Sequence, residues 1–416
     1  MPPTASNEIR AERRNAARRG EDANRRRRGL AGLALTGPLL VFLLAFFAAP
    51  VGNILLTGIH SPDVATAMPR TVAALEKWRG TSRPGDDVFA AVIRDLRTAY
   101  AARTVADAAE RLNRERPGFR SLLMKTARIA DELDISDPVE AVVTIDAAWN
   151  EIETWRALKR AGEAWTPRFL AAALDMEMDW KRGLELRPPD ERVYLSLLGR
   201  TLWMALVVTV VCLAAAYPLA HVMARTRGRL ERVLVFLVLL PFWMSVLVRT
   251  VAWMVILQKD GIANDALQWL DVVDAPLSLI FNRAGVYISM VYVLLPFAVL
   301  PMYAVMRGIA ATQVQAAESL GARPLAAFFT VYLPQSAPGV AAAAVLVFIV
   351  SVGFYVTPAL VGGPQDQMIG SVIAHNALTT ANWSMAAALS LVLLGVVVAL
   401  YPLYSRAAGP LTGRIN

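Results

Sequence analysis

The sequence predicts an all-α membrane protein of six transmembrane helices with a separate, charged helical segment. Hydrophobic residues make up 56% of the 416 residues and the mean hydropathy is positive, which exceeds the usual level of a soluble globular domain. The net charge of +8 is concentrated near the start, where residues 1–29 hold nine Arg against four acidic residues. Such a cluster beside an apolar run is a membrane-orientation signal, so we expect a lipid bilayer as a partner and no nucleic acid.

The expected spans follow from apolar runs that approach the roughly 20 residues needed to cross a bilayer. They lie near residues 30–57, 196–223, 231–257, 284–306, 338–361 and 385–405. Several contain proline, which lipid tolerates when neighbouring helices satisfy the freed carbonyls. The runs are therefore typical of helices that form a bundle.

The loops between the spans alternate in charge. Residues 225–232 carry four Arg and one Glu, whereas residues 258–283 hold four Asp against one Lys and one Arg. Lys and Arg are retained on the cytoplasmic side of a membrane, which predicts a multi-pass inner-membrane protein with both termini inside. The rule assigns to the cytoplasm the N-terminus (1–29), the loop 225–232, the segment 307–337 and the tail (408–416).

Residues 61–190 would then lie outside the membrane, after the first span (30–57). The stretch holds 22 acidic and 20 basic residues, as a soluble surface would. It also carries helix signals, such as Asp137 as an N-cap followed by Pro138 in the first turn and Glu140 at the third position. We predict a helical extracytoplasmic insertion, followed by a five-helix core over residues 191–407; the alternative is a flexible charged linker.

A polar stretch, QAAESLGARPLAAFFTVYLP, separates the fourth and fifth apolar runs at residues 315–334. Thr312 is placed to cap a helix whose third residue is Gln315. Gly321 permits a tight turn, and Pro324 suits the first turn of a second helix. Leu333 and Pro334 would end that helix before the chain re-enters the membrane. The pattern predicts a compact helix-turn-helix on the cytoplasmic side.

The spacing of this stretch resembles the EAA loop of ATP-binding cassette (ABC) importer permeases. That pattern reads Glu-Ala-Ala, three residues, Gly, nine residues, Ile, one residue, Leu-Pro. The corresponding residues are Gln315, Ala316, Ala317, Gly321, Val331, Leu333 and Pro334. Gln315 replaces Glu and Val331 replaces Ile, and the loss of the acid puts an ion pair at that position in doubt unless Glu318 supplies it one turn later.

The resemblance covers roughly residue 190 to the C-terminus and, more loosely, the first span, and it implies the type I ABC importer permease fold. It also implies that residues 311–335 form a coupling helix seated in an ATPase subunit. Its ATPase-coupling residues would be Gln315, Ala316, Ala317, Glu318, Gly321, Leu333 and Pro334. The stretches LLPFWMSVLVRTVAWMVIL (239–257) and FYVTPALVGGPQDQMIGSVI (354–373) resemble the spermidine/putrescine branch, although branches that import iron, sulfate or opines share parts of them.

Candidate pathway residues come from the third, fourth and fifth runs. Arg249 lies inside the third run, where a cation is costly unless it faces the bundle interior. It either lines the pathway, ties helices through carbonyls or snorkels to the outer interface. Aromatic faces for an organic cation would come from Trp243, Trp253, Tyr292, Phe354 and Tyr355. The alternative for these rings is ordinary packing or an interfacial belt.

Catalytic chemistry is not expected of this chain. It has no GxxxxGK[ST] motif for ATP, and Cys212 is its single cysteine. His60, His221 and His375 are far apart in sequence, so we predict no catalytic residues, no metal site and no cofactor. ATP hydrolysis would fall to a partner subunit.

The predicted function is that of a permease subunit of an ABC importer, forming a translocation pathway for polyamines. The resemblance implies a second permease subunit, two ATPase subunits and an extracytoplasmic substrate-binding protein. None of the predicted spans has Asp or Glu at its centre, which favours selection of the solute by that binding protein. The alternatives are another small solute, such as an opine, an amino acid derivative or a ferric ion, and a membrane sensor built on residues 61–190.

Overall fold

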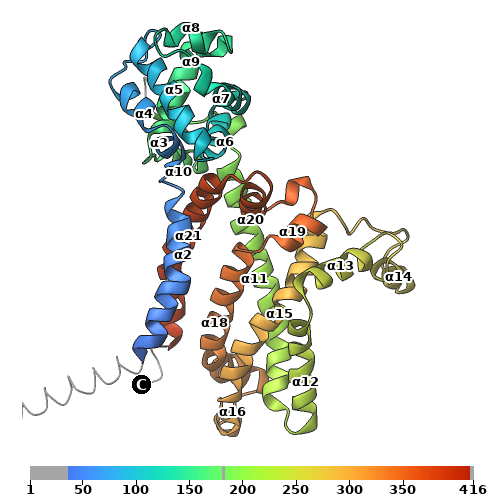
Figure 1. Cartoon of the computed structure of the whole chain (residues 1–416). Helices are drawn as coiled ribbons and strands as arrows, with labels where there is room; N and C mark the ends of the chain where they lie inside the picture. Colours follow the sequence, from blue (N-terminus) through green and yellow to red (C-terminus); the bar gives the residue numbers. More distant parts are fainter. Residues whose placement is uncertain (1–35, 180–182, 413–416) are drawn as a thin grey trace, which may run out of the picture. The chain divides into compact units, whose positions relative to one another are not determined.

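The computed structural model describes residues 36–179 and 183–412 (Figure 1). The predicted basic segment 1–29, the start of the first predicted span and the last residues of the tail lie outside the described residues. The chain divides into two units, Met1–Leu56 and Thr57–Asn416, and each is described by itself.

Within the described residues, five helices are long and apolar enough to cross a membrane. They are Thr36–Leu56, which contains α2 (Ala49–Leu56), Tyr194–Arg225 (α11), Arg283–Arg307 (α15), Pro324–Val352 and Trp383–Leu400. A bent pair, Arg229–Trp243 with Val246–Ile256, makes a sixth if it is counted as one span. The predicted all-α membrane fold is therefore confirmed.

The third predicted span, 231–257, is not one straight helix. It consists of α12 (Arg229–Leu239), a short helical turn and α13 (Val246–Ile256), with a bend of 99° between the two halves. Pro241 lies in the turn and has no N–H to donate, and the Ser245 side chain instead caps α13 by accepting the N–H of Leu247. The hydropathy run is continuous across the bend, so composition alone did not predict it.

The three helices α11, α15 and α18 (Leu333–Val352) pack together as the centre of the core (Figure 1). Small side chains on α11, such as Ala216 and Ala220, are fully buried there and let the helices approach closely. Gly339 lies against the backbone of α15 at Met302, where an added Cβ would come within 3.2 Å of the Met302 Cα. Tyr217 and Ser336 share a hydrogen bond of 2.9 Å between α11 and α18.

The polar stretch forms α16 (Ala311–Ser319) and α17 (Pro324–Ala327), joined by a turn at Gly321. Two expectations here are wrong. Thr312 is not the N-cap, because α16 begins at Ala311 after Ala310 and has no side-chain cap. Leu333 and Pro334 do not end the second helix, because α17 runs through a π-helical segment, Phe328–Tyr332, into α18 without a break. Pro334 therefore lies inside a continuous helix, directly after the π-helical segment, where its missing N–H leaves one helical hydrogen bond unmade.

The fifth predicted span, 338–361, ends early. Helix α18 stops at Val352, and the chain turns through residues 353–355 before α19 (Val356–Val361). The remaining helices of the core are α14 (Ile262–Trp269), α20 (Ile369–Ala374) and α21 (Trp383–Thr412). Helix α13 packs against α19, and both contact α15, so the continuations of the two broken spans meet.

The segment predicted as an insertion is helical and has an apolar core of its own. Its helices are α3 (Asp63–Ala67), α4 (Pro69–Glu76), α5 (Asp86–Ala101), α6 (Val105–Glu115), α7 (Phe119–Arg128), α8 (Pro138–Val143), α9 (Ile152–Gly162) and α10 (Arg168–Ala173). Phe89, Trp149 and Trp155 pack at its centre with tilted rings, and Trp155 Nε1 donates to the Trp149 carbonyl at 2.8 Å. The expected cap of α8 is present, since Asp137 accepts the N–H of Glu140 at 3.3 Å. Its placement outside the cytoplasm stays a prediction.

The end of this segment joins the core through a hairpin and a buried acid. Strands β1 (Met176–Asp179) and β2 (Gly183–Leu186) pair antiparallel, with Met176 opposite Leu186, which the helical prediction did not include. Just before β1, the fully buried Asp175 accepts the backbone N–H groups of Val193, Tyr194 and Leu195 at 3.2, 3.1 and 2.7 Å. A carboxylate in this position satisfies free N–H groups at the start of α11 and opposes the positive end of its dipole.

Candidate coupling and translocation sites

The turn between α16 and α17 is a Schellman motif centred on Gly321. The Gly321 N–H donates to the Glu318 carbonyl and the Ala322 N–H to the Ala317 carbonyl, both at 3.0 Å. Gly321 has φ +94°, a conformation that other residues adopt at a cost, and open space surrounds the position of its missing Cβ. The glycine of the EAA pattern is thus needed for the backbone turn and not for close packing.

Most predicted coupling residues lie on the surface of this helical turn. Gln315, Ala316, Glu318 and Gly321 are exposed, and Ala317 is half-buried. Large apolar side chains are exposed beside them, including Leu320 (89% exposed) and Leu325 (74% exposed). We call α16, the Gly321 turn and α17 (residues 311–327) the knob. Exposed apolar side chains of this kind are typical of a surface that another subunit covers. Leu333 and Pro334 lie apart from the knob, at the start of α18.

An aromatic cluster attaches this knob to α11. Phe328 and Tyr332, on the π-helical segment, surround the His221 ring with centroid distances of 5.7 and 4.7 Å. The Tyr217 ring meets the edge of Phe328 at 6.2 Å. Because the π-helical segment is continuous with both α17 and α18, these rings connect the knob to α11.

Sequence reasoning missed this cluster. His221 was considered only as a metal ligand, and Phe328 and Tyr332 lie within the quoted stretch without an assigned role. The available signal was their spacing of four residues, which places two aromatic rings on one helical face.

The candidate pathway lies where α13, α19 and α15 meet. Thr250 and Thr357 are fully buried and share a hydrogen bond of 3.2 Å between α13 and α19. One turn along α13, Trp253 packs edge-on against Tyr292 of α15, with centroids 5.3 Å apart. The structure therefore brings two of the predicted pathway aromatics together.

Arg249 lies at this junction on the first turn of α13. Its side chain is buried, with 6% of the residue exposed, and its Nε and Nη1 have no hydrogen-bond partner among the described residues. This arrangement argues against snorkelling to an interface, because a snorkelling guanidinium reaches polar surroundings. A buried cation without a partner is costly, and such groups inside membrane helices mark functional sites.

The other predicted pathway residues do not all join this junction. Phe354 and Tyr355 lie in the turn between α18 and α19, where Phe354 is half-buried against the central core cluster and Tyr355 is 41% exposed. Trp243, at the bend of the third span, is 84% exposed on this chain. Irregular backbone at membrane depth is tolerated only where protein or a water-filled cavity surrounds it, so both breaks are expected to face protein or the pathway.

Comparison with known proteins identifies the family. The profile described as "Binding-protein-dependent transport system inner membrane component" matches residues 216–404. Over 224 residues the chain is 33% identical to the spermidine/putrescine transport system permease protein PotB of Escherichia coli (strain K12), which covers 54% of this chain and 82% of PotB. The chain belongs to this family.

One further relative and one solved structure are also similar to the chain. The inner membrane ABC transporter permease protein YdcU of Escherichia coli (strain K12) is 34% identical over 228 residues, which cover 51% of this chain and 72% of YdcU. Among solved structures, the bacterial alginate ABC transporter in complex with an alginate pentasaccharide-bound periplasmic protein has a TM-score of 0.44 and 16% identity, over 53% of this chain and 80% of that chain.

Membership confirms the expected class of activity. The chain is a permease component of an ABC importer and a multi-pass protein of the inner membrane, and its relatives are transport components rather than enzymes. The resemblance that was based on residues 315–334 is thereby confirmed, because the family match includes that stretch.

Proposed function

We propose that this permease carries polyamines, delivered by an extracytoplasmic binding protein, along a pathway beside α13, α19 and α15. The observation that supports the solute class is the 33% identity to a spermidine/putrescine permease over 82% of that relative. The Trp253 and Tyr292 rings offer π-faces that attract an organic cation without holding it tightly. Weak attraction suits a pathway, since a carried solute must also leave.

In this proposal a second permease subunit completes the pathway and two ATPase subunits grip the apolar knob of each permease. Movement of the knob on ATP binding is transmitted to α11 through Phe328, Tyr332 and His221. Both termini of the chain lie in the cytoplasm. The chain supplies the translocation pathway and the coupling segment that transmits movement, and it needs no cofactor.

A second candidate solute is a small carboxylate, such as an opine or an amino acid derivative. The observation in its favour is Arg249, whose buried guanidinium has no anionic partner among the described residues. A positive charge beside the pathway repels a dication and attracts a carboxylate. Ferric ion is less compatible with the same charge.

The test is uptake into proteoliposomes that hold the complex purified with its partner subunits. Labelled putrescine is offered with the binding protein that functions with this permease, and then with the binding protein of an opine importer that docks on the same complex. Under the proposal, putrescine enters with the first protein, and a labelled opine enters only where the second protein delivers it, because the binding protein selects the solute. ATP hydrolysis without putrescine uptake, with the first protein present, would refute the polyamine assignment.

A further inference from the structure

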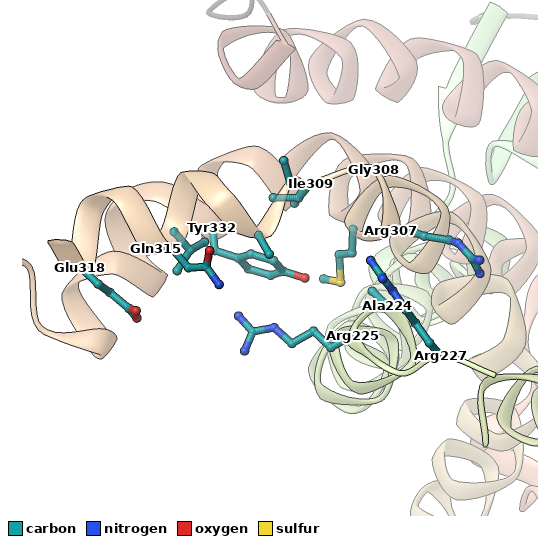
Figure 2. Close-up of a pocket in the computed structure, with 13 residues that line it drawn as sticks. Ala224, Arg225, Arg227, Arg307, Gly308, Ile309, Gln315, Glu318 and Tyr332 are labelled. Atoms are coloured by element: carbon teal, nitrogen blue, oxygen red, sulfur yellow. The ribbon is translucent and has the colours of Figure 1, made fainter. Parts of the chain in front are cut away.

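A cavity of about 550 Å³ lies beside the coupling segment, and none of the roles above uses it. Its wall is formed by the end of α11, the end of α15, the start of α16 and the ring of Tyr332. Figure 2 shows the side chains of Arg225 and Tyr332 pointing into this space, with Gln315 and Glu318 on the helix beyond. The cavity therefore touches both the central helices and the knob.

The lining of the cavity is strongly basic. Arg225, Arg227 and Arg307 contribute guanidinium groups, and Glu318 contributes the one carboxylate among its lining residues. Arg307 is already bound to Glu231 and to the Tyr303 hydroxyl. Arg225 and Arg227 have no ion pair within the part of the chain that the structure describes, so their charge is available to an anion.

A buried hydroxyl provides an independent sign of a missing ligand. Tyr332 is 4% exposed, and its hydroxyl has no hydrogen-bond partner among the described residues. The Arg225 guanidinium lies 5.4 Å from the centre of the Tyr332 ring, so the cation and the tyrosine line the same cavity side by side. Buried polar groups are nearly always satisfied, so an unpaired donor in a cavity wall is expected to meet a bound acceptor.

The height of the cavity relative to the membrane suggests the source of that acceptor. Helices α11 and α15 are long enough to cross the bilayer, and they end at Arg225 and Arg307. Arginine at the end of a spanning helix lies at the level of the lipid headgroups. Phosphate offers several acceptor oxygens and matches the planar guanidinium fork.

We propose that this cavity binds the phosphate of an anionic phospholipid headgroup, held by Arg225, Arg227 and the Tyr332 hydroxyl. A basic pocket between membrane helices at the headgroup level is the usual form of such a site. The bound lipid connects the end of α11 to the base of the knob. The inference does not depend on which solute the permease carries.

The test is native mass spectrometry of the complex, purified in detergent from bacterial membranes and titrated with phosphatidylglycerol or phosphatidylcholine. We expect Arg225→Gln with Arg227→Gln to weaken phosphatidylglycerol binding about fivefold for each arginine, or about 25-fold for the pair. Tyr332→Phe, which keeps the ring, should weaken it about fivefold through the lost hydrogen bond. Phosphatidylcholine should bind weakly to all variants.

The matched control is Arg229→Gln with Arg323→Gln, which removes two exposed arginines that do not line the cavity. The pair Arg225→Lys with Arg227→Lys keeps the charge and should retain most of the binding, which separates loss of the site from misfolding. Competition with inorganic phosphate distinguishes a lipid headgroup from free phosphate as the ligand. Displacement of phosphatidylglycerol by phosphate at millimolar levels supports a phosphate site that takes free anions as well. Equal phosphatidylglycerol binding by the glutamine pair and its control would overturn the proposal. So would the absence of bound lipid in the wild-type complex, because a partner subunit would then fill the cavity.

Discussion

At the scale of single residues, Arg249 holds a positive charge inside the helix bundle, with no acidic partner among the residues that the structure describes. Replacing a buried, unpaired ion by an apolar side chain of similar length is neutral or stabilising when the charge has no functional role in binding. Replacing Arg249 by an apolar residue therefore tests a role in transport without an expected loss of stability.

For a carboxylate solute we expect Arg249→Met to lower the transport rate at least about tenfold, the effect of losing an interaction of about 1.4 kcal/mol. The putrescine transport rate should not fall, because the substitution removes a positive charge that repels a dication. The melting temperature of the complex should stay the same or rise. Arg200→Met is the control, because Arg200 is a half-buried arginine on α11 outside the α13 junction. An unchanged carboxylate transport rate in Arg249→Met would remove this residue from the pathway.

Asp95 shows how burial controls a charge in the helical segment before the core. Its carboxylate accepts the backbone N–H and the hydroxyl of Thr71 at 2.7 and 2.8 Å. Burial nevertheless raises the pKa of Asp95 above its ordinary value, because it outweighs those hydrogen bonds. The folded chain thus holds this proton more tightly than the unfolded chain does.

The sign of the pH dependence follows from that difference. The contribution of Asp95 to the free energy of unfolding increases as the pH falls through the raised pKa, and it is unfavourable at higher pH where the carboxylate is ionised. In Asp95→Asn, which keeps an acceptor oxygen for Thr71, this contribution should vanish. The check is the melting temperature of the variant minus that of the wild type, measured from pH 4 to pH 8. The difference should increase with pH, and a flat difference would contradict the raised pKa.

At the scale of elements, the start of α11 depends on one distant acid. Asp175 provides the acceptor for three backbone N–H groups, and we expect Asp175→Ala to cost about 2 kcal/mol as these groups lose their partner. Amide hydrogen exchange at residues 193–195 should then accelerate about 30-fold. The exposed Asp190, which lies between the hairpin and α11, provides the control Asp190→Ala, with unchanged exchange.

Substitutions of the neighbouring residues Phe328 and Phe329 test two roles of the coupling segment separately. One role is transmission of movement to α11, and the other is docking of the ATPase subunit. Phe328 packs against Tyr217 and His221, whereas Phe329 is 60% exposed. We expect Phe328→Ala to leave ATPase subunits bound and hydrolysing ATP while solute transport per ATP falls several-fold. Phe329→Ala should instead weaken copurification of the ATPase. If both variants lost subunits equally, the aromatic cluster would not be the transmitting contact.

The helices of the core could be predicted from the sequence because each corresponds to a continuous stretch of apolar residues. The bend after α12 and the stop after Val352 could not, since the runs 231–257 and 338–361 remain apolar across both breaks. Pro241 was visible, but a proline inside lipid is compatible with either a kink or a break. The breaks depend on the packing of α13 against α19, which the sequence does not reveal.

Of the candidate sites, the coupling turn could be predicted from the sequence, whereas the aromatic pair and the basic cavity could not. The EAA spacing located the coupling turn because Gly321 needs a positive φ, which limits the residue at that position. Trp253 and Tyr292 were named without a reason to pair them, and they meet only because α13 turns towards α15. The cavity basic residues Arg225 and Arg227 were interpreted as an orientation signal alone, since nothing in the sequence places Tyr332 beside them.

At the scale of the whole molecule, a series of contacts connects the coupling segment to the junction of α13, α19 and α15. The knob contacts α11 through aromatic rings, and α11 packs against α15, which carries Tyr292. The helical segment before the core is also built into this unit, because Asp175 caps α11 and α10 packs against α21. A sensor that signals through a separate cytoplasmic module would not require these links.

ATP-dependent uptake of labelled spermidine and putrescine into proteoliposomes tests both the proposed solute and the role of the coupling turn. The complex is assembled with its binding protein and contains either the wild-type chain or Gly321→Trp. Gly321→Trp replaces the residue with φ +94° at the knob, and open space around it limits the effect to the turn and to the surface that a partner covers. We expect rapid polyamine uptake with the wild type and none with the variant. Equal uptake by both would contradict the lever role of the coupling turn, and hydrolysis of ATP without polyamine uptake by the wild type would contradict the proposed solute.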